Sequence, residues 1–475
     1  MSSKTKIIAT LGPASSSRKV LKELIIAGVD LCRINFSHGT HDDCAKIIGD
    51  IRAINSECGT NVAILADLQG PKIRIGEAKE KTKLKTGSEV LVTDKPGVTT
   101  YEVIRINHPG IMKDLKENDT ILIDDGNIIL HVKEKIKKNY RKAIVVSGGA
   151  LLSNKGVNLP QSRLSMPSLT QKDRADLEFA LEHKIEWIGL SFVRRAEDIS
   201  ELKSRVRERS PHTKIIAKIE KPEAVKNIDA VINASDGIMV ARGDLGVEMP
   251  MQDVPLIQKM LVKKCLLASR PVIIATQMME SMVNNLFPTR AEVNDVANAI
   301  MDGADAVMLS AETSIGKHPV KVIDAVQKII ARTETYEGIY NRHYPPSAPE
   351  DPRFISDSVC YNACLLSERI GAKAIITMTH SGYTAFKISA FRPNADIFVF
   401  TYNTAILNTM NLLWGVKCFY YDKFASTDQT IDEIKKILKQ QGLVKPGDTV
   451  INIASIPIAE KGMSNMLKVS RVEAG

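Results

Sequence analysis

Residues 214–244 read KIIAKIEKPEAVKNIDAVINASDGIMVARGD. The stretch holds two short apolar runs on either side of a segment with helical patterning. The first run ends on Lys218 and Glu220, and the second ends on Arg242 and Asp244. Short apolar runs joined by a helix are typical of parallel strands, which need a long crossover connection. The stretch therefore predicts a strand–helix–strand unit whose strands both end on charged side chains.

The same pattern recurs along most of the chain. We identify eight apolar runs, at residues 6–10, 29–35, 61–67, 185–191, 214–220, 237–244, 271–277 and 306–312. One of the helical segments between them, TRAEVNDVANAIMDG, begins with Thr289 and Glu292, which have the spacing of a capping box. Eight strand–helix units in series predict a TIM (β/α)8 barrel.

Two further regions interrupt or follow this series. Residues 72–158 alternate apolar and polar positions between Gly and Asp turns, as in DTILIDDGNIILHVKEKI, which predicts a small all-β insertion. This insertion could close over the barrel as a lid, and a rigid decoration is the alternative. Residues 345–475 again mix helices and strands. We therefore expect an α/β protein in which residues 1–71 and 159–344 form the barrel, residues 72–158 the lid, and residues 345–475 a C-terminal α/β regulatory or assembly domain.

Composition restricts the class of protein. A chain of 475 residues, 44% hydrophobic and 25% charged, is too long for one core and is typical of a soluble multidomain protein. No apolar run approaches the roughly 18 residues of a membrane span. The seven cysteines include no Cys-x-x-Cys pair, which favours a reducing cytoplasm. The net charge of +9 is dispersed and aromatic residues make up only 5%, so anionic metabolites explain it better than nucleic acid.

Polar side chains close every one of the eight runs. In a barrel the carboxyl ends of the strands meet on one face, where such enzymes carry out their chemistry. The residues at these ends are Thr10, Arg33, Asn35, Asp67, Ser191, Lys218, Glu220, Arg242, Asp244, Thr276, Ser310 and Glu312. A full ring of polar strand ends is hard to explain by solubility alone and predicts an active face.

Glu220 and Asp244 end two successive strands. Two carboxylates in this arrangement suit Mg²⁺, which keeps several waters and also takes substrate oxygens. Lys218 lies two residues before Glu220 and so points to the same side of its strand, where it could neutralise charge on a phosphoryl group. A structural salt bridge in the barrel mouth has equal weight on spacing alone.

Three basic residues, Arg33, Arg74 and Lys155, lie in or near the loops of the predicted active face. Together they could clamp phosphate or carboxylate oxygens. The hydroxyl groups and the acid of Thr276, Ser310 and Glu312 suit a proton relay.

These residues indicate a metal-assisted reaction on an anionic substrate. They leave two reaction classes open, namely phosphoryl transfer and a metal-dependent carbon–carbon lyase that acts on an anionic keto acid. A Schiff-base lysine at a barrel strand end would look much like Lys218.

A series of longer sequence motifs points to one family of proteins. RINFSHG, DLQGPKIRIG, NKGVNLP, KIEKPEAV, MVARGDLGVE, ATQMMESM, PTRAEVNDVANAIMDGADAVMLSAET and TxSGxT follow one another along almost the whole chain. In this order they resemble the pyruvate kinase family. The resemblance implies the last step of glycolysis, in which the phosphoryl group of phosphoenolpyruvate passes to ADP and gives pyruvate and ATP. It also implies Mg²⁺, with Mn²⁺ as a substitute, and a cytoplasmic homotetramer without nucleic-acid or membrane partners.

The resemblance also assigns roles residue by residue. It implies that Glu220 and Asp244 bind Mg²⁺ and that Lys218 stabilises the moving phosphoryl group. The remaining implied contacts are Gly243, Asp244 and Thr276 with the substrate carboxylate, Arg33 with its phosphate, Thr276, Ser310 and Glu312 with the transferred proton, and Asn35, Ser37, His38, Arg74 and Lys155 with the nucleotide.

One departure from the family pattern concerns an effector. Thr379, Ser381, Gly382 and Thr384 keep a phosphate pocket rich in hydroxyl and amide groups. The family often has a glycine-rich return near its last strands, where this chain has Glu460 instead. A glutamate facing that pocket would repel a phosphate. The sequence leaves the existence and identity of an effector open.

The other departure concerns a monovalent cation. Asn35, Ser37, Asp67 and Leu68 resemble the K⁺ region of the family, and K⁺-requiring members typically carry Glu at the position of Lys72. A lysine ammonium has about the charge and size of K⁺ and is permanently attached. We therefore expect Lys72 to replace the cation and the enzyme to need no K⁺. A solvated loop lysine is the alternative.

Overall fold

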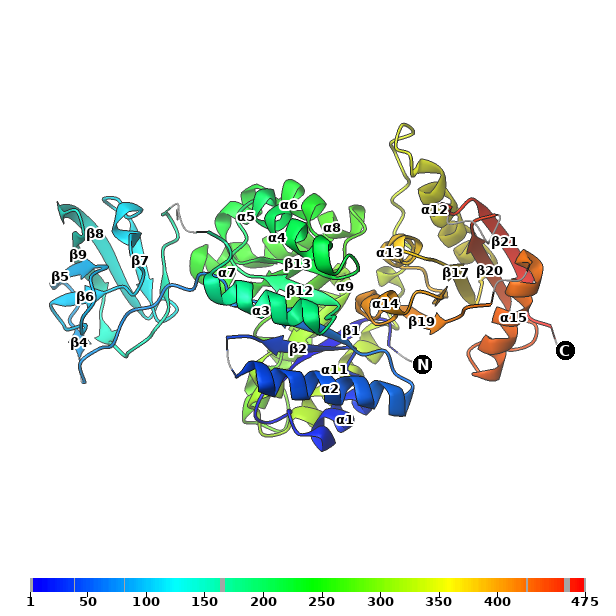
Figure 1. Ribbon diagram of the computed structural model, residues 1–475, viewed down its shortest axis with the longest axis horizontal. Coiled ribbons are helices and arrows are strands. Elements are labelled where there is room, and N and C mark those ends of the chain that lie inside the picture. The colour runs from blue at the N-terminus through cyan, green and yellow to red at the C-terminus, as the bar shows by residue number, and fades with distance from the viewer. Residues whose placement is uncertain are drawn as a thin grey trace.

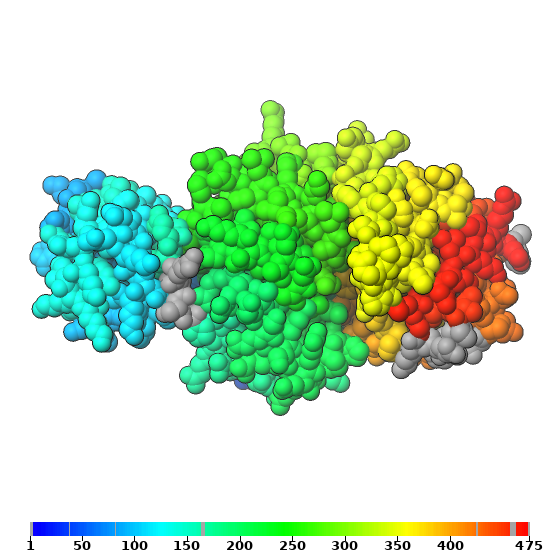
Figure 2. Space-filling model, turned by 90° about the horizontal axis from the view of Figure 1, so that it is seen from above, coloured from blue at the N-terminus to red at the C-terminus, as the bar shows by residue number. Residues whose placement is uncertain are grey.

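The computed structural model describes residues 3–37, 39–80, 82–162, 167–423, 426–456 and 462–473. His38 and Glu460, two residues singled out above, lie outside these ranges. The molecule is elongated, with a small β domain at one end, a barrel in the middle and an α/β domain at the other end (Figures 1 and 2).

The central part is a closed barrel of parallel strands. Within the described ranges its eight strands run in the order β1-β16-β15-β14-β13-β12-β3-β2. Their bounds are β1 Lys6–Thr10, β2 Leu31–Asn35, β3 Ala63–Asp67, β12 Trp187–Leu190, β13 Lys214–Ile219, β14 Gly237–Ala241, β15 Val272–Ala275 and β16 Ala306–Leu309. The predicted TIM barrel is confirmed, and each strand falls within one of the eight predicted runs.

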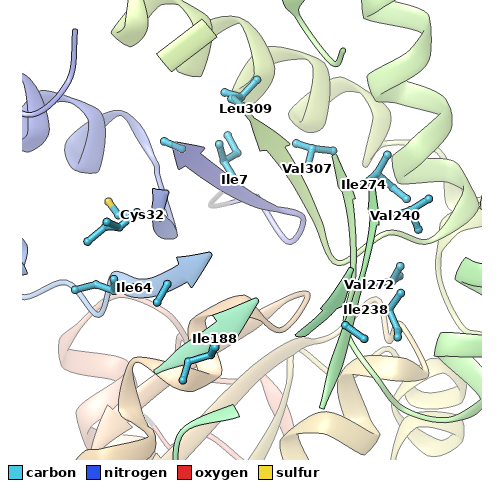
Figure 3. Close-up of a cluster of buried hydrophobic side chains, with 14 of the residues drawn as sticks. Ile7, Cys32, Ile64, Ile188, Ile238, Val240, Val272, Ile274, Val307 and Leu309 are labelled. Atoms are coloured by element: carbon cyan, nitrogen blue, oxygen red, sulfur yellow. The ribbon is translucent and has the colours of Figure 1, made fainter. Parts of the chain in front are cut away.

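Helices cover the outside of the barrel. They are α1 Arg18–Ala27, α2 His41–Cys58, α3 Gln171–Glu182, α4 Ala196–Arg209, α5 Pro222–Lys226, α6 Ile228–Ala234, α7 Arg242–Glu248, α8 Val254–Leu267, α9 Arg290–Asp302, α10 Ala311–Ser314 and α11 Pro319–Thr333. Thr289 and Glu292 form the predicted capping box of α9. Outward-facing strand residues such as Ile7, Ile64 and Val307 form the core between strands and helices (Figure 3).

Three residues at predicted strand ends belong to helices instead. Arg242 and Asp244 lie in the first turn of α7, and Glu312 lies in the first turn of α10. In both cases a short helix begins within two residues of the end of a four- or five-residue strand. Polar residues after a strand do not distinguish an extended continuation from a helical turn, so the sequence placed these three residues on the correct face but in the wrong element.

A second core fills the interior of the barrel. Inward-facing side chains such as Ile8, Leu65 and Ile216 are fully buried there, together with Trp187. Leu412 from the C-terminal domain packs into the same cluster and is also fully buried. The floor of the barrel is therefore completed by a side chain of another domain.

The lid domain leaves the barrel after β3 and returns before α3. It contains a six-stranded sheet of order β11-β7-β8-β9-β5-β6 and a β10-β4 pair within the described residues. The strands are β4 Lys83–Leu84, β5 Glu89–Thr93, β6 Val103–Arg105, β7 Thr120–Ile123, β8 Ile128–Lys137, β9 Tyr140–Ser147, β10 Gly149–Ala150 and β11 Val157–Asn158. Its own buried cluster, which includes Val92 and Leu130, makes it a separate core.

The C-terminal part is an α/β domain. Its described sheet has the order β19-β18-β17-β20-β21, with only β21 antiparallel. The elements are α12 Phe354–Ile370, β17 Ala374–Met378, α13 Tyr383–Ala390, β18 Asp396–Thr401, α14 Thr404–Leu407, β19 Val416–Tyr420, α15 Thr427–Gln440, β20 Thr449–Ala454 and β21 Met466–Arg471. This domain packs against the amino ends of the barrel strands.

Candidate active site

A buried cluster of charges lies at the carboxyl ends of β2, β3 and β13. Arg33 donates from Nε to Asp67 Oδ2 at 2.7 Å and from Nη1 to Thr10 Oγ1 at 2.9 Å. Asp67 Oδ1 lies 3.1 Å from Lys218 Nζ. Burial favours the neutral acid, but the charges of Lys218 and Arg33 outweigh it and hold the pKa of Asp67 below its ordinary value. Asp67 is thus an ionised carboxylate between two cations.

Lys218 is the centre of this cluster. Its Nζ donates to Ser191 Oγ at 2.7 Å and lies 3.0 Å from Glu220 Oε1. Burial alone would lower the pKa of Lys218, but the carboxylates of Asp67 and Glu220 raise it above its ordinary value. Schiff-base chemistry needs a lysine that readily loses its proton. A permanently charged Lys218 therefore argues against the lyase alternative.

Glu220 and Asp244 form the predicted carboxylate pair. Glu220 is 2% exposed, and its Oε2 accepts a hydrogen bond from the backbone N–H of Phe192 at 2.8 Å. Burial raises the pKa of Glu220, Lys218 opposes this, and the negative charge of Asp244 raises it further. Among the described residues, the Asp244 carboxylate has no hydrogen-bond or ion-pair partner. Two carboxylates that repel each other, one of them unpaired, are a fitting ligand set for a divalent cation.

The described residues contain no cluster of three or more His, Cys, Asp or Glu side chains that could enclose a metal. The pair supplies only two protein ligands. Mg²⁺ usually binds through one or two carboxylates, several waters and substrate oxygens. The limited donor set therefore suits Mg²⁺ better than a metal that needs a complete protein cage.

Thr276 joins the loops after β14 and β15. Its Oγ1 accepts a hydrogen bond from the backbone N–H of Gly243 at 2.8 Å, and Arg242 Nη2 donates to its carbonyl oxygen at 2.7 Å. Thr276 has a φ of 68°, which is unfavourable for a β-branched residue. Arg242 is itself held by Asp295 through contacts of 2.7 Å. These bonds fix a strained backbone next to Asp244, as is common at functional sites.

Ser310 and Glu312 lie together after β16. Glu312 Oε2 accepts from the backbone N–H of Ser310 at 2.6 Å, and Oε1 accepts from that of Met279 at 3.1 Å. Glu312 is 2% exposed. Both of its oxygens thus hold backbone groups of the loops after β15 and β16, and the Ser310 side chain is half-buried at the same place.

The predicted nucleotide residues are divided between the barrel and the lid. Arg74 Nη1 donates to the carbonyl oxygen of Asn154 at 2.9 Å, and Lys155 Nζ lies 2.8 Å from Asp124 Oδ1. Both basic side chains therefore contact lid groups and are not part of the Lys218 cluster.

On the barrel side, Asn35 Oδ1 accepts from the backbone N–H of Ser37 at 3.0 Å, which orders the turn after β2. Their neighbour His38 lies outside the described residues, so its predicted contact with the nucleotide has no structural counterpart here.

Lys72 lies in the segment that leads from β3 into the lid. Its side chain is exposed, and a Cβ built on Gly156, which directly precedes β11, would lie 3.8 Å from Lys72 Cε. Asp67 is instead contacted by Arg33 and Lys218. The fully buried Leu68 donates its N–H to the carbonyl of Gly189 at 3.0 Å. The structure therefore brings Asn35, Ser37 and Asp67 to one strand end, with Lys72 further along, at the base of the lid.

The four effector candidates surround the start of α13. The Gly382 N–H donates to Thr379 Oγ1 at 2.9 Å, and the Tyr383 N–H lies 3.4 Å from Ser381 Oγ. Gly382 has a φ of 84°, and an added Cβ would come within 2.4 Å of a carbon of Met410. Thr384 is buried. Residues 457–461, including Glu460, lie outside the described residues.

A pocket of about 30 Å³ opens between the lid and the barrel. Its lining includes Asp244, Phe192, Lys72, Lys221 and Asn158. The last two were not predicted, and neither was Glu248, which both of them contact. Lys221 directly follows Glu220 and could have been noticed for that reason. Asn158 and Glu248 lie 90 positions apart, and no local pattern connects them.

Comparisons with known proteins agree with this geometry. The family models described as "Pyruvate kinase, barrel domain" and "Pyruvate kinase, alpha/beta domain" match residues 2–323 and 357–470. A pyruvate kinase of Geobacillus stearothermophilus is 41% identical over 99% of this chain and 80% of its own length. One of Agrobacterium vitis is 42% identical over 98% of both chains.

A solved structure is also similar. The crystal structure of a pyruvate kinase from Cryptosporidium parvum superposes with a TM-score of 0.92 at 32% identity, over 99% of this chain and 96% of that one. The chain therefore belongs to the pyruvate kinase family, the phosphotransferases that transfer the phosphoryl group of phosphoenolpyruvate to ADP in the last step of glycolysis.

Proposed function

We propose that this chain performs the family reaction at the carboxyl ends of β13 and β14, with Lys218, Glu220 and Asp244 as its central groups. The observation that carries the proposal is the position of Lys218 Nζ, 3.1 Å from Asp67 Oδ1 and 3.0 Å from Glu220 Oε1. An ammonium kept charged beside a metal-binding carboxylate can neutralise a phosphoryl group in transit. Little covalent work is required of the protein, so positioning and charge dominate.

Glu220 and Asp244 would hold Mg²⁺, or Mn²⁺ in its place. When bound, the cation supplies charge neutralisation to the phosphate oxygens. The chain's own contribution is to present two hard oxygen donors at a fixed separation. The hydrogen bond from Phe192 to Glu220 supports this role, because it orients one carboxylate while leaving Asp244 free to bind.

The substrate would lie between β2 and β15. Arg33, whose side chain is 12% exposed and fixed by Asp67 and Thr10, suits the phosphate of phosphoenolpyruvate. Gly243, Asp244 and Thr276 suit its carboxylate end, since a hydrogen bond from Gly243 to Thr276 fixes the start of α7 against the residue that follows β15. Protonation of the enolate carbon would then use the hydroxyl groups of Thr276 and Ser310, in loops held together by Glu312.

ADP would bind between the barrel and the lid. Asn35, Ser37 and His38 would supply the barrel side, and Arg74 and Lys155 the lid side. The two basic residues now contact lid groups, so they would turn toward the nucleotide phosphates as it binds. Exposed long cations of this kind can change partners at small cost.

The enzyme would work without K⁺. Asp67, which with Asn35, Ser37 and Leu68 marks the monovalent-cation region, already has two cationic partners in Arg33 and Lys218. Lys72 adds a third positive charge at the base of the lid. Full activity in Na⁺ or tetramethylammonium buffer lacking K⁺ is expected. An absolute K⁺ requirement would refute this part of the proposal.

The larger organisation is also proposed. Residues 1–71 and 159–344 would be the barrel, 72–158 the lid, and 345–475 a regulatory and assembly domain with an effector pocket at Thr379, Ser381, Gly382 and Thr384. The enzyme would be a homotetramer, which rests on the family resemblance alone. It would be cytoplasmic, which its seven free cysteines, all at described positions, support. Within the described residues, no helix is both long and apolar enough to cross a membrane.

A coupled assay tests the proposed reaction. Purified protein with phosphoenolpyruvate, ADP and Mg²⁺ should form pyruvate, and chelation of the metal should stop it. Borohydride with a keto acid should fail to trap Lys218. Absence of pyruvate from folded protein, or trapping of Lys218, would contradict the proposal.

A further inference from the structure

Glu248, the last residue of α7, holds a buried carboxylate that the proposed mechanism does not use. Its side chain is 1% exposed. Its Oε1 accepts two hydrogen bonds, from Lys221 Nζ at 2.6 Å and from Asn158 Nδ2 at 2.7 Å. A carboxylate this deeply buried needs such partners, because losing one leaves an unsatisfied acceptor away from water.

Glu248 and its two partners come from three different parts of the molecule. Asn158 ends β11, the strand by which the lid returns to the barrel, and pairs within the lid with Leu122 of β7. Lys221 immediately follows Glu220. A single carboxylate therefore connects the lid to the segment that carries one of the two metal-binding acids.

Glu248 is also connected to the other acid, along α7. Asp244 lies four residues before it on α7, and residues four apart share one face of a helix. Asp244, Lys221 and Asn158 also line the same small pocket between lid and barrel. A shift of the lid that pulled on Asn158 would thus act on a seven-residue helix whose first turn holds Asp244.

We propose that Glu248 is a positioning residue that makes the position of the lid and the position of the Asp244 carboxylate depend on each other. The proposal rests on the assignment of Glu220 and Asp244 as metal ligands made above. Lys221 neutralises the charge of Glu248 and holds it against the barrel, while Asn158 is the contact from the lid. When the lid is displaced, the Asn158 bond is lost and α7 loses its restraint at the end nearest the lid.

The test uses the full-length protein and the variant N158A, which removes the bond from the lid and keeps the Lys221–Glu248 pair. Q161A is the matched control, because Gln161 lies three residues further along the same segment and its Oε1 accepts from the N–H of the lid residue Thr120 and not from a group of α7. Two quantities are measured without turnover. They are the affinity for Mn²⁺ by electron paramagnetic resonance, and amide hydrogen exchange of residues 242–248 in metal-free protein.

In N158A we expect Mn²⁺ affinity to fall about tenfold, the size of effect usual for groups that orient a metal ligand. Exchange over residues 242–248 should accelerate, and Q161A should change neither quantity. Unchanged exchange in N158A would overturn the coupling, as would equal effects in both variants. Faster exchange with unchanged Mn²⁺ affinity would show that the Asn158–Glu248 contact restrains α7 without positioning Asp244, and would also overturn the proposal.

The measurements separate this inference from the proposed function. If Glu220→Gln leaves Mn²⁺ affinity unchanged, the assigned metal site is wrong. The exchange comparison between N158A and Q161A still tests the Asn158–Glu248 contact in that case, since it needs no metal.

Discussion

The two ends of the barrel each bury an ion pair, but they use it differently. At the carboxyl end, Lys218 lies against Asp67 and Glu220. At the amino end, Arg392 of the C-terminal domain lies 2.9 Å from Asp305 Oδ2, and both side chains are almost fully buried. Each end therefore buries one basic side chain in contact with carboxylate groups, namely two at the carboxyl end and one at the amino end.

The difference lies in what surrounds the charges. Asp305 also accepts backbone N–H groups of Val272 and Trp414, and the Trp414 ring lies 5.0 Å from the Arg392 guanidinium. That pair is enclosed by protein on all these sides. At the other end, Asp244 stays unpaired within the described residues, and a pocket opens beside it. A buried charge thus stabilises the fold where protein groups satisfy all of its contacts, as at Asp305. It is available for chemistry where a ligand must supply a contact, as at Asp244.

Replacing the lysine at the carboxyl end should give the largest effect. Lys218→Met removes the group that neutralises the transferring phosphoryl group, and we expect kcat for pyruvate formation to fall by about 10³-fold or more. Enolpyruvate protonation should persist, because it needs no phosphoryl transfer. Steady-state assays of both reactions check this, and a loss of both together in folded protein would contradict the assigned role.

The corresponding substitution at the amino end should affect stability instead of catalysis. Arg392→Met leaves the Asp305 carboxylate buried without its cation, and should lower the free energy of unfolding by about 3–5 kcal/mol. Denaturant unfolding measures this, while kcat of the folded protein should stay near the wild-type value. The double variant Arg392→Met with Asp305→Asn should recover part of the stability. A large fall in kcat for either variant would erase the distinction between the two ends.

Removing one metal-binding acid should show that the carboxyl-end cluster depends on a metal. Glu220→Gln keeps the side-chain shape but removes a charged ligand, and the Mg²⁺ concentration for half-maximal activity should rise about 100-fold, at the upper end of effects reported around metal sites. A Mg²⁺ titration of the rate checks this. An unchanged titration would mean that the carboxyl-end cluster is structural, like its counterpart at the amino end.

The smallest expected effect lies on the barrel wall between the two ends. Thr289→Ala removes the capping box of α9 and should cost about 1 kcal/mol of unfolding free energy. Thermal unfolding measures the shift, and kcat should not change. Ser426→Ala removes the equivalent capping box of α15 in the C-terminal domain, and is the matched control for the loss of a helix cap outside the barrel.

The sequence predicted what depends on local period and spacing. The eight strands follow from short apolar runs, and the meeting of Lys218 with Glu220 follows from a separation of two residues on one strand. It did not predict contacts that exist only after folding, such as Asn158 with Glu248 or Arg392 with Asp305. Each of these joins residues that are about 90 positions apart in different domains or elements, and a charged residue gives no local sign that it will be buried.

Leu412 has a consequence for how the chain is made. Its side chain completes the inner core of the barrel, beside Trp187 and Ile8. A ribosome releases the chain from the amino terminus, and domains generally fold in that order as they emerge. The last barrel strand is synthesised about one hundred residues before the leucine that seals its floor. A nascent barrel therefore exposes an apolar opening until the following domain arrives, which makes that domain a late folding partner as well as a neighbour.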